Sequence, residues 1–275
     1  MKRFLPRFIA ALFLGLSLLG AVAIGQDDYD PFWGLRPTIG AELPNLKTSS
    51  SLDKYIDPTC KEFTNEVGVS YPVNTGSAQV DAALASIGEK IYREYYNNDM
   101  GGCPDEPFTS NTESYSRTSY RANSPSKNYL SVLFTTNAMG AGAAHGHELS
   151  KGYLFDLRTG RSLDLNDIIA DTRLAMPGLW NVMTYAWCGL GFGELPDGYD
   201  LPYDSKSCEN GPPYPMPKKL IRARVSLEDL GGVLFTPKGL TIRLDSPYSY
   251  ADGPQEISIN KRGLESLGFK SDLWD

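Results

Sequence analysis

Residues 142–165, GAAHGHELSKGYLFDLRTGRSLDL, carry the clearest local pattern of the chain. A run of small residues leads into His145 and His147, the only two histidines in the protein. The residues after them alternate as in a strand, and one predicted face carries Leu149, Lys151, Tyr153, Phe155 and Leu157. Gly160 can take the left-handed position of a turn that closes the strand. The pattern therefore predicts a loop, a strand and a tight turn, with all imidazole groups in the loop.

Working outward, apolar residues recur at steps of three and four from Val80 to Tyr95, which predicts an amphipathic helix. Asp164 or Asn166 can cap a second helix that begins near Asp167, and a small C-terminal helix is expected around residues 261–267. Alternating segments predict further strands at 67–73, 114–122, 128–136, 219–226, 232–236, 240–244 and 256–259. Strands joined by short turns, with segregated helices, indicate an α+β fold with a mainly antiparallel sheet.

The N-terminus predicts export. Lys2, Arg3 and Arg7 precede an uncharged run over residues 8–25, and Ala21-Val22-Ala23 matches a cleavage site. Residues 1–23 are therefore interpreted as a signal peptide. The alternative is an uncleaved anchor, because about 18 apolar residues reach the lower limit for a membrane span. The cleavage site favours a periplasmic or secreted protein that has no membrane span once the signal peptide is removed.

The charge balance limits the possible partners. The chain has 26 Lys and Arg against 33 Asp and Glu, and cleavage removes three basic groups and no acidic ones, which leaves 23 against 33. A net charge near −10 repels nucleic acid and attracts a cationic partner. We therefore do not expect the protein to bind nucleic acid.

Four cysteines in an exported chain predict two disulfides. Proximity in the sequence favours Cys60 with Cys103 and Cys188 with Cys208, although four cysteines allow three connectivities. Free buried thiols and a zinc site are the alternatives, and zinc is disfavoured because no C-x-x-C spacing occurs.

Composition divides the mature chain into three parts. Residues 24–57 are rich in Pro, Ser and charge and are predicted to be a flexible tether. Residues 58–136 are predicted to form an N-terminal α+β subdomain and residues 137–270 a C-terminal domain. Within the latter, residues 189–217 are expected to form a surface loop stapled by the second cysteine pair.

The histidine pair allows two interpretations. His145 and His147 could share a metal ion with Glu148, or with Asp156, since histidines two apart in a strand point to one side. However, H-x-H alone is a weak motif, and a glycine-rich turn with His145 bonded to backbone is the simpler interpretation. No nucleophile elbow occurs, and no carboxylate pair stands out for glycosidase chemistry. We expect a non-catalytic protein without a cofactor.

Tyrosines are the other candidate binding residues, because they give rigid, amphipathic contact surfaces for proteins or sugars. One group, in the first half of the chain, includes Tyr92, Tyr95, Tyr96, Tyr115 and Tyr120. Others lie beside acidic residues of the stapled loop. The candidate ligand-binding set is His145, His147, Tyr153, Tyr199, Asp200, Tyr203 and Asp204.

Several blocks of residues occur in an order and spacing typical of one known family. The blocks are Tyr71-Pro72, the helix 80–95, Asn128–Val132, Ala144–Gly146, Phe155–Gly160, Leu163–Ile168, Phe235–Leu240 and Gly253–Ile259. They resemble the paired extracytoplasmic domains of unknown function in the anti-sigma factor RsiV, also found ahead of some peptidoglycan deacetylase domains. The resemblance covers about residues 65–268.

The resemblance implies a binding module, since in RsiV this region captures lysozyme, a strongly basic protein. About seven residues precede the apolar run, so a sigma-binding segment is not expected. A deacetylase domain is not expected either, because none follows the matched region. Ala143 replaces the second glycine of the family pattern, and residues 189–217 are longer than that pattern needs. We expect a ligand that is a basic lysozyme-like protein or peptidoglycan. The alternative function is a metal-dependent hydrolase acting on cell-wall glycan.

Overall fold

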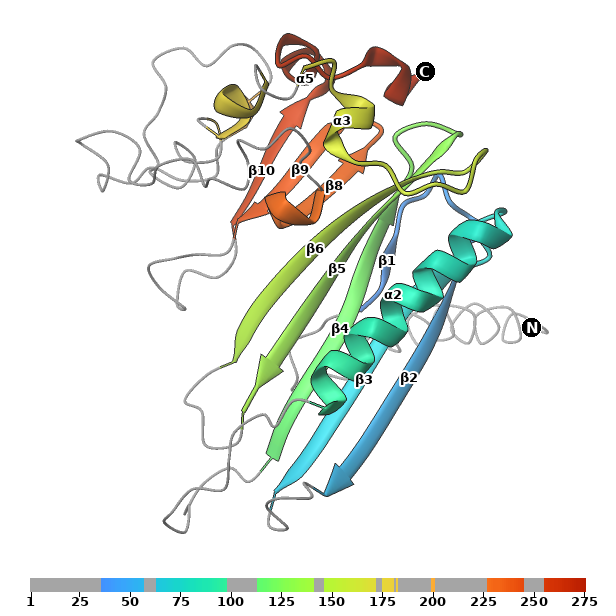
Figure 1. Ribbon diagram of the computed structural model, residues 1–275, viewed down its shortest axis with the longest axis vertical. Coiled ribbons are helices and arrows are strands. Elements are labelled where there is room, and N and C mark those ends of the chain that lie inside the picture. Colours follow the sequence, from blue (N-terminus) through green and yellow to red (C-terminus); the bar gives the residue numbers. More distant parts are fainter. Residues whose placement is uncertain are drawn as a thin grey trace, which may run out of the picture. The chain divides into compact units, whose positions relative to one another are not determined.

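The structure, a computed structural model, describes residues 36–56, 63–97, 113–140, 146–171, 175–180, 182, 199–200, 227–244 and 255–275. All of them belong to one compact unit, Leu35–Asp275. Helices and two mainly antiparallel sheets make up this unit, which confirms the predicted α+β class (Figure 1).

The first sheet contains the long strands. Its order is β2-β3-β4-β5-β6, with β1 paired to β4. The pairs β3·β4 and β1·β4 are parallel and the other neighbours are antiparallel. The strands are β1 (Thr38–Ile39), β2 (Lys47–Ile56), β3 (Thr64–Val73), β4 (Glu113–Asn123), β5 (Tyr129–Met139) and β6 (His147–Asp156).

Helix α2 (Ala78–Asn97) connects β3 to β4 and covers one face of this sheet (Figure 1). The predicted stripe is its buried face: Val80 and Leu84 are fully buried in one cluster with Tyr120 and Phe134 of the sheet. Gly88 lies inside this helix, where an added Cβ would be 2.6 Å from the Tyr71 ring. The glycine that weakens the helix locally therefore permits close packing on β3.

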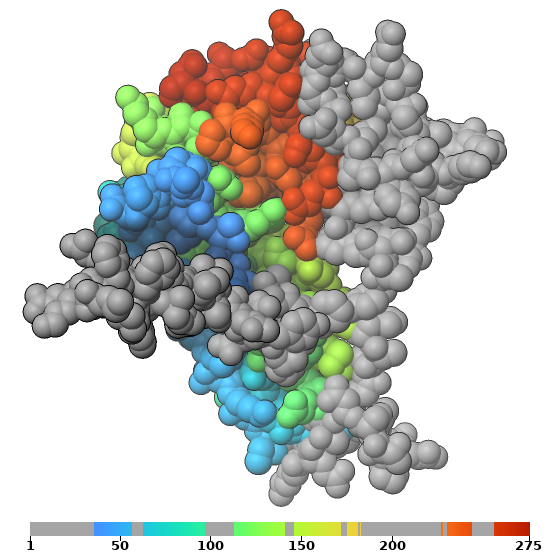
Figure 2. Space-filling view, turned by 180° about the vertical axis from the view of Figure 1, so that it is seen from behind, coloured from blue at the N-terminus to red at the C-terminus, as the bar shows by residue number. Residues whose placement is uncertain are grey.

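The second sheet has the order β7-β10-β9-β8 and is antiparallel. One face is apolar and packs on α3 (Leu165–Ile168), α5 (Lys261–Ser266), the helical residues 175–180 and the C-terminal 3₁₀ turn η4 (Ser271–Trp274). On the first sheet, β8 lies against β4, β5 and β6. Figure 2 shows the orange and red segments of the second sheet beside the green segments of the first. The strands are β7 (Tyr199–Asp200), β8 (Gly232–Thr236), β9 (Gly239–Leu244) and β10 (Gln255–Asn260).

Two glycines allow the sheets to cross closely. A Cβ on Gly152 of β6 would overlap the carbonyl oxygen of Val233 and lie 2.9 Å from its backbone nitrogen. The Gly152 N–H donates to the Gly231 carbonyl at 3.1 Å. A Cβ on Gly232 would lie 2.7 Å from the Ser150 Cβ. Neither strand has room for a side chain at the crossing.

The turn after β6 follows the prediction. Gly160 has a φ of 71°, in the left-handed region. Asp156 accepts hydrogen bonds from the Arg158 backbone at 2.8 Å and from its Nε at 3.1 Å. These bonds lower the pKa of the Asp156 carboxyl. Asp164 caps α3 through a reciprocal capping box with Asp167, as expected from the sequence.

Two predicted boundaries are wrong. Residues 47–56, assigned to the tether 24–57, form β2, which pairs with β3 over its whole length. Their Ser-rich composition reflects solvent exposure on an edge strand. The boundary between 58–136 and 137–270 falls inside β5, and β5 pairs with β6 from Tyr129 to Ala138, so one sheet spans both predicted parts. Within the described residues, no helix combines the length and apolar composition that crossing a bilayer requires.

All four cysteines lie outside the described residues, but the described ends around Cys60 and Cys103 meet. Thr64 of β3 is in register with both Ile56 of β2 and Glu113 of β4. The Tyr55 hydroxyl donates to the Tyr96 carbonyl at 3.2 Å, next to the C-terminal end of α2. The two cysteine-containing segments therefore depart from one end of the first sheet.

We predict a Cys60–Cys103 disulfide, detectable by peptide mapping under non-reducing conditions. Closing a loop of this length stabilises the fold by roughly 4 kcal/mol in the chain-entropy model. The Cys60→Ser/Cys103→Ser double variant should lose up to that amount in urea unfolding. A peptide linking Cys60 to Cys188 or Cys208 would contradict the pairing.

Candidate functional site

The α2-facing side of β6 contains the first candidate surface. The strand places His147, Leu149, Lys151, Tyr153 and Phe155 on this side, as the alternation predicts. Leu149 remains 45% exposed. A shallow pocket forms between α2 and β6, lined by Ile91, Glu94, Tyr95, Phe134, Thr136, Leu149 and Lys151.

The pocket has little charge of its own. The Lys151 Nζ lies 4.0 Å from Glu94 Oε2, and both side chains are more than 40% exposed. Burial raises the pKa of the Tyr95 phenol above its ordinary value. The pocket therefore offers an apolar floor with one weak ion pair at its rim.

The metal-binding alternative with Glu148 as the third ligand requires His147 and Glu148 to converge, and they do not. Successive strand residues point to opposite faces. His147 is exposed on the α2 side, whereas Glu148 forms an ion pair with Arg243 of β9 on the other side. His145 lies outside the described residues. Within the part of the chain that the structure describes, no group of three or more His, Cys, Asp or Glu could hold a metal ion.

Tyr153 occupies a packing position. It is half-buried between the Phe134 ring, 5.8 Å away between centroids and edge-on, and the Phe155 ring, 6.4 Å away and stacked. Its predicted role as a ligand-binding residue gains no support from this placement.

The acidic segment is attached to the second sheet. Tyr199 and Asp200 form β7, and their backbones are in register with Ile259 and Ser258 of β10. Tyr203 and Asp204 lie outside the described residues. Two of the four predicted loop residues are thus held at the sheet edge by main-chain pairing.

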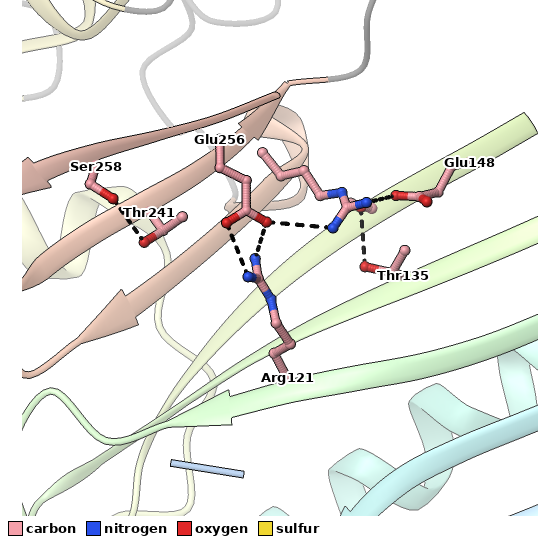
Figure 3. Close-up of polar contacts among 8 residues, drawn as sticks. Arg121, Thr135, Glu148, Thr241, Glu256 and Ser258 are labelled. Carbon is pink, nitrogen blue, oxygen red and sulfur yellow. Dashed lines mark hydrogen bonds and ion pairs between the residues drawn. The ribbon is translucent and has the colours of Figure 1, made fainter. Parts of the chain in front are cut away.

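A chain of alternating charges joins the two sheets (Figure 3). Arg121 of β4 contacts both carboxylate oxygens of Glu256 on β10, at 2.7 and 3.0 Å. Arg243 of β9 lies 3.4 Å from Glu256 and also pairs with Glu148 of β6. Side-chain exposures of 16–36% show that the chain is partly buried. Because each charge has an opposite partner, the arrangement acts as a clamp between the sheets.

Nothing in the sequence indicates this network. Arg121 and Glu256 are 135 positions apart, and each occupies an ordinary polar position of an alternating strand. No local signal marks such a pair.

A tyrosine cluster lies where α2 passes over β2. The Tyr55 and Tyr96 ring centroids are 4.5 Å apart, and Tyr92 stacks on Tyr96 at 5.4 Å. The Tyr92 hydroxyl donates to Asp53 at 2.5 Å. Partial burial and then this bond to the carboxylate raise the pKa of Tyr92. The sequence indicated Tyr92 and Tyr96 as a contact surface but not their partners on β2.

Comparison with known proteins gives a fold relationship. No protein-family model matches the chain, and no curated protein matches it. One similar solved structure is a DUF3298 family protein from Pseudomonas aeruginosa PAO1, with 14% identity, a TM-score of 0.50, and 83% of this chain and 96% of that chain covered. Another is a DUF3298 family member from Bacteroides fragilis, with 19% identity, a TM-score of 0.46, and 82% and 94% covered.

At these identities the likeness concerns the fold alone. The two solved structures are members of DUF3298, a domain family of unknown function.

Proposed function

We propose that the protein is an exported, non-catalytic module that binds a basic, lysozyme-like protein through its acidic segment 189–217. The observation that carries the proposal is the distribution of charge. In the described scaffold, several carboxylates pair with arginines, as in Glu66–Arg117, Glu148–Arg243, Glu256–Arg121 and Asp156–Arg158. Segment 189–217 contains five acidic residues and one lysine.

This separation suits a binding module. Charges that are paired within the scaffold contribute little to the field outside it, whereas an acidic excess in one segment steers a cationic partner toward that segment. Tyr199, Tyr203 and Tyr214 lie in the same segment and supply aromatic contact area. Pairing of β7 with β10 anchors the segment to the second sheet.

The resemblance to RsiV supports the choice of ligand. The two most specific parts of the resemblance are residues 144–168 and 235–259. The first contains β6, its turn and α3, and the second contains the end of β8, β9 and most of β10. Their buried residues meet in one core, in which Leu154 and Leu165 pack with Phe235 and Ile257. The blocks thus belong to a single structural unit, and its strand β10 pairs with Tyr199 and Asp200 of the acidic segment.

The test is binding to hen lysozyme at low and moderate salt. We predict that Asp197→Asn/Asp200→Asn/Asp204→Asn raises the dissociation constant about tenfold, because exposed ion pairs contribute about 0.2–1 kcal/mol each. The matched control neutralises three exposed scaffold acids, Glu265→Gln/Asp272→Asn/Asp275→Asn, and should leave binding within about twofold.

Absence of lysozyme binding at both salt concentrations would remove the proposed ligand. An equal loss in the control variant would show that net charge matters and the segment does not. Sedimentation with purified sacculi distinguishes the peptidoglycan alternative, since a cell-wall module would co-sediment without binding lysozyme.

A further inference from the structure

Strand β2 is an unusually bare edge of the first sheet. It is the outermost strand of that sheet in Figure 1, and eight of its ten residues are exposed. Leu52 and Ile56 are 62% and 65% exposed. Its pairing with β3 runs from Lys47 to Ile56 in unbroken register without a bulge, and β2 itself contains no proline. Among the described residues, no strand pairs with the outer edge of β2. Such long, regular edges are templates for strand addition.

We propose that β2 pairs antiparallel with β2 of a second copy of this chain, which joins two first sheets across a two-fold axis. This inference goes beyond the proposed function and concerns a different edge of the molecule. The two-fold axis is perpendicular to the joined sheet, so the α2-bearing faces of both copies lie on the same side. Asp53 and Tyr55 contact α2 residues and define that side. Residues directly opposite each other must therefore lie on the same face of the joined sheet, so their positions in β2 differ by an even number. This condition is met only when the two-fold axis passes beside one residue, on which the register is then centred.

Charge and the length of paired strand together select one of these registers. Centring on Asp53 would oppose two carboxylates, and centring on Lys54 would oppose two ammonium groups. Centring on Leu52 brings no opposite charges of β2 together. Centring on Ser50 would place Lys47 opposite Asp53, but it pairs only residues 47–53 of each strand, whereas centring on Ser51 pairs residues 47–55. Centring on Ser51 places Lys47 of one copy opposite Tyr55 and diagonal to Asp53 of the other, and the symmetry repeats these contacts.

The Ser51-centred register uses groups that are accessible in the single chain. Lys47 and Asp53 are both exposed. The Tyr92 hydroxyl occupies only the Oδ2 atom of Asp53. Strand pairing alone covers less area than a standard permanent interface, so we expect a reversible dimer with a dissociation constant in the micromolar range.

Cross-linking of the purified chain tests the register. Ser51→Cys should form a covalent dimer under mild oxidation, because the two Ser51 positions face each other across the axis. Leu52→Cys and Asp53→Cys should cross-link at least fivefold less. Preferential cross-linking through position 52 or 53 would overturn the Ser51-centred pairing.

Sedimentation velocity tests the charge contacts. Lys47→Asp should raise the dimer dissociation constant at least tenfold, and Lys47→Asp/Asp53→Lys should restore it. Lys90→Asp, which makes the same charge change on the exposed surface of α2, should leave dimerisation unchanged. A chain that stays monomeric at all concentrations would overturn the proposal. Protection of the outward-pointing β2 amides in hydrogen exchange, those that do not pair with β3, would then indicate coverage by the chain's own residues. Lysozyme binding by Lys47→Asp should remain intact, which separates this test from that of the proposed function.

Discussion

Gly152→Ala is expected to lower the free energy of unfolding by about 3 kcal/mol or more, because overpacking at a rigid contact leaves no route for relaxation. The new Cβ would meet backbone atoms of Val233 from β8, and backbone cannot rotate away as a side chain can. Separation of the strands would also stretch the hydrogen bond from Gly152 to the Gly231 carbonyl. We therefore expect the second sheet to separate from β6.

Urea unfolding followed by circular dichroism measures this effect. Gly76→Ala is the matched control, because Gly76 has a φ of 86° and no atom within 4 Å of the added Cβ. That change should cost only the backbone strain, about 1 kcal/mol. Equal losses for the two variants would show that the crossing is not sterically closed.

Arg243→Met should cost about 2 kcal/mol of stability, the second largest expected effect. Removing one member of a buried ion pair leaves a carboxylate without compensation, which costs about 3–5 kcal/mol when burial is complete. The Arg243 and Glu148 side chains are 16% and 20% exposed, so water reduces this penalty. Glu256 keeps Arg121, whereas Glu148 loses the ion pair with Arg243.

Two comparisons separate network loss from ordinary surface effects. Lys54→Met breaks a pair whose side chains are 57% and 55% exposed, and should cost less than about 0.5 kcal/mol. Arg243→Met/Glu148→Gln should be more stable than the sum of the single changes predicts, because the uncompensated charge is then removed. Strict additivity would contradict the coupling between the sheets.

Local patterns predicted the regular elements well where one face is buried. The α2 stripe and the alternation in β6 both appear as expected, because a buried face demands apolar residues at fixed periods. The Gly160 turn and the Asp164 cap were also readable, since they depend on residues within a few positions. Strand β2 was missed because its exposed faces carry no hydrophobic period.

By itself, the sequence determined the α+β class, the α2 helix, the β6 strand with its turn, and the strongly acidic character of segment 189–217. Each depends on neighbours in the chain or on composition. The tertiary structure alone decided that β2 extends the first sheet, that Gly152 and Gly232 let two sheets cross, and that Arg121, Glu256, Arg243 and Glu148 form one network. These features join segments far apart in sequence through backbone pairing, steric fit and ion pairing, and none of the three leaves a periodic trace in the chain.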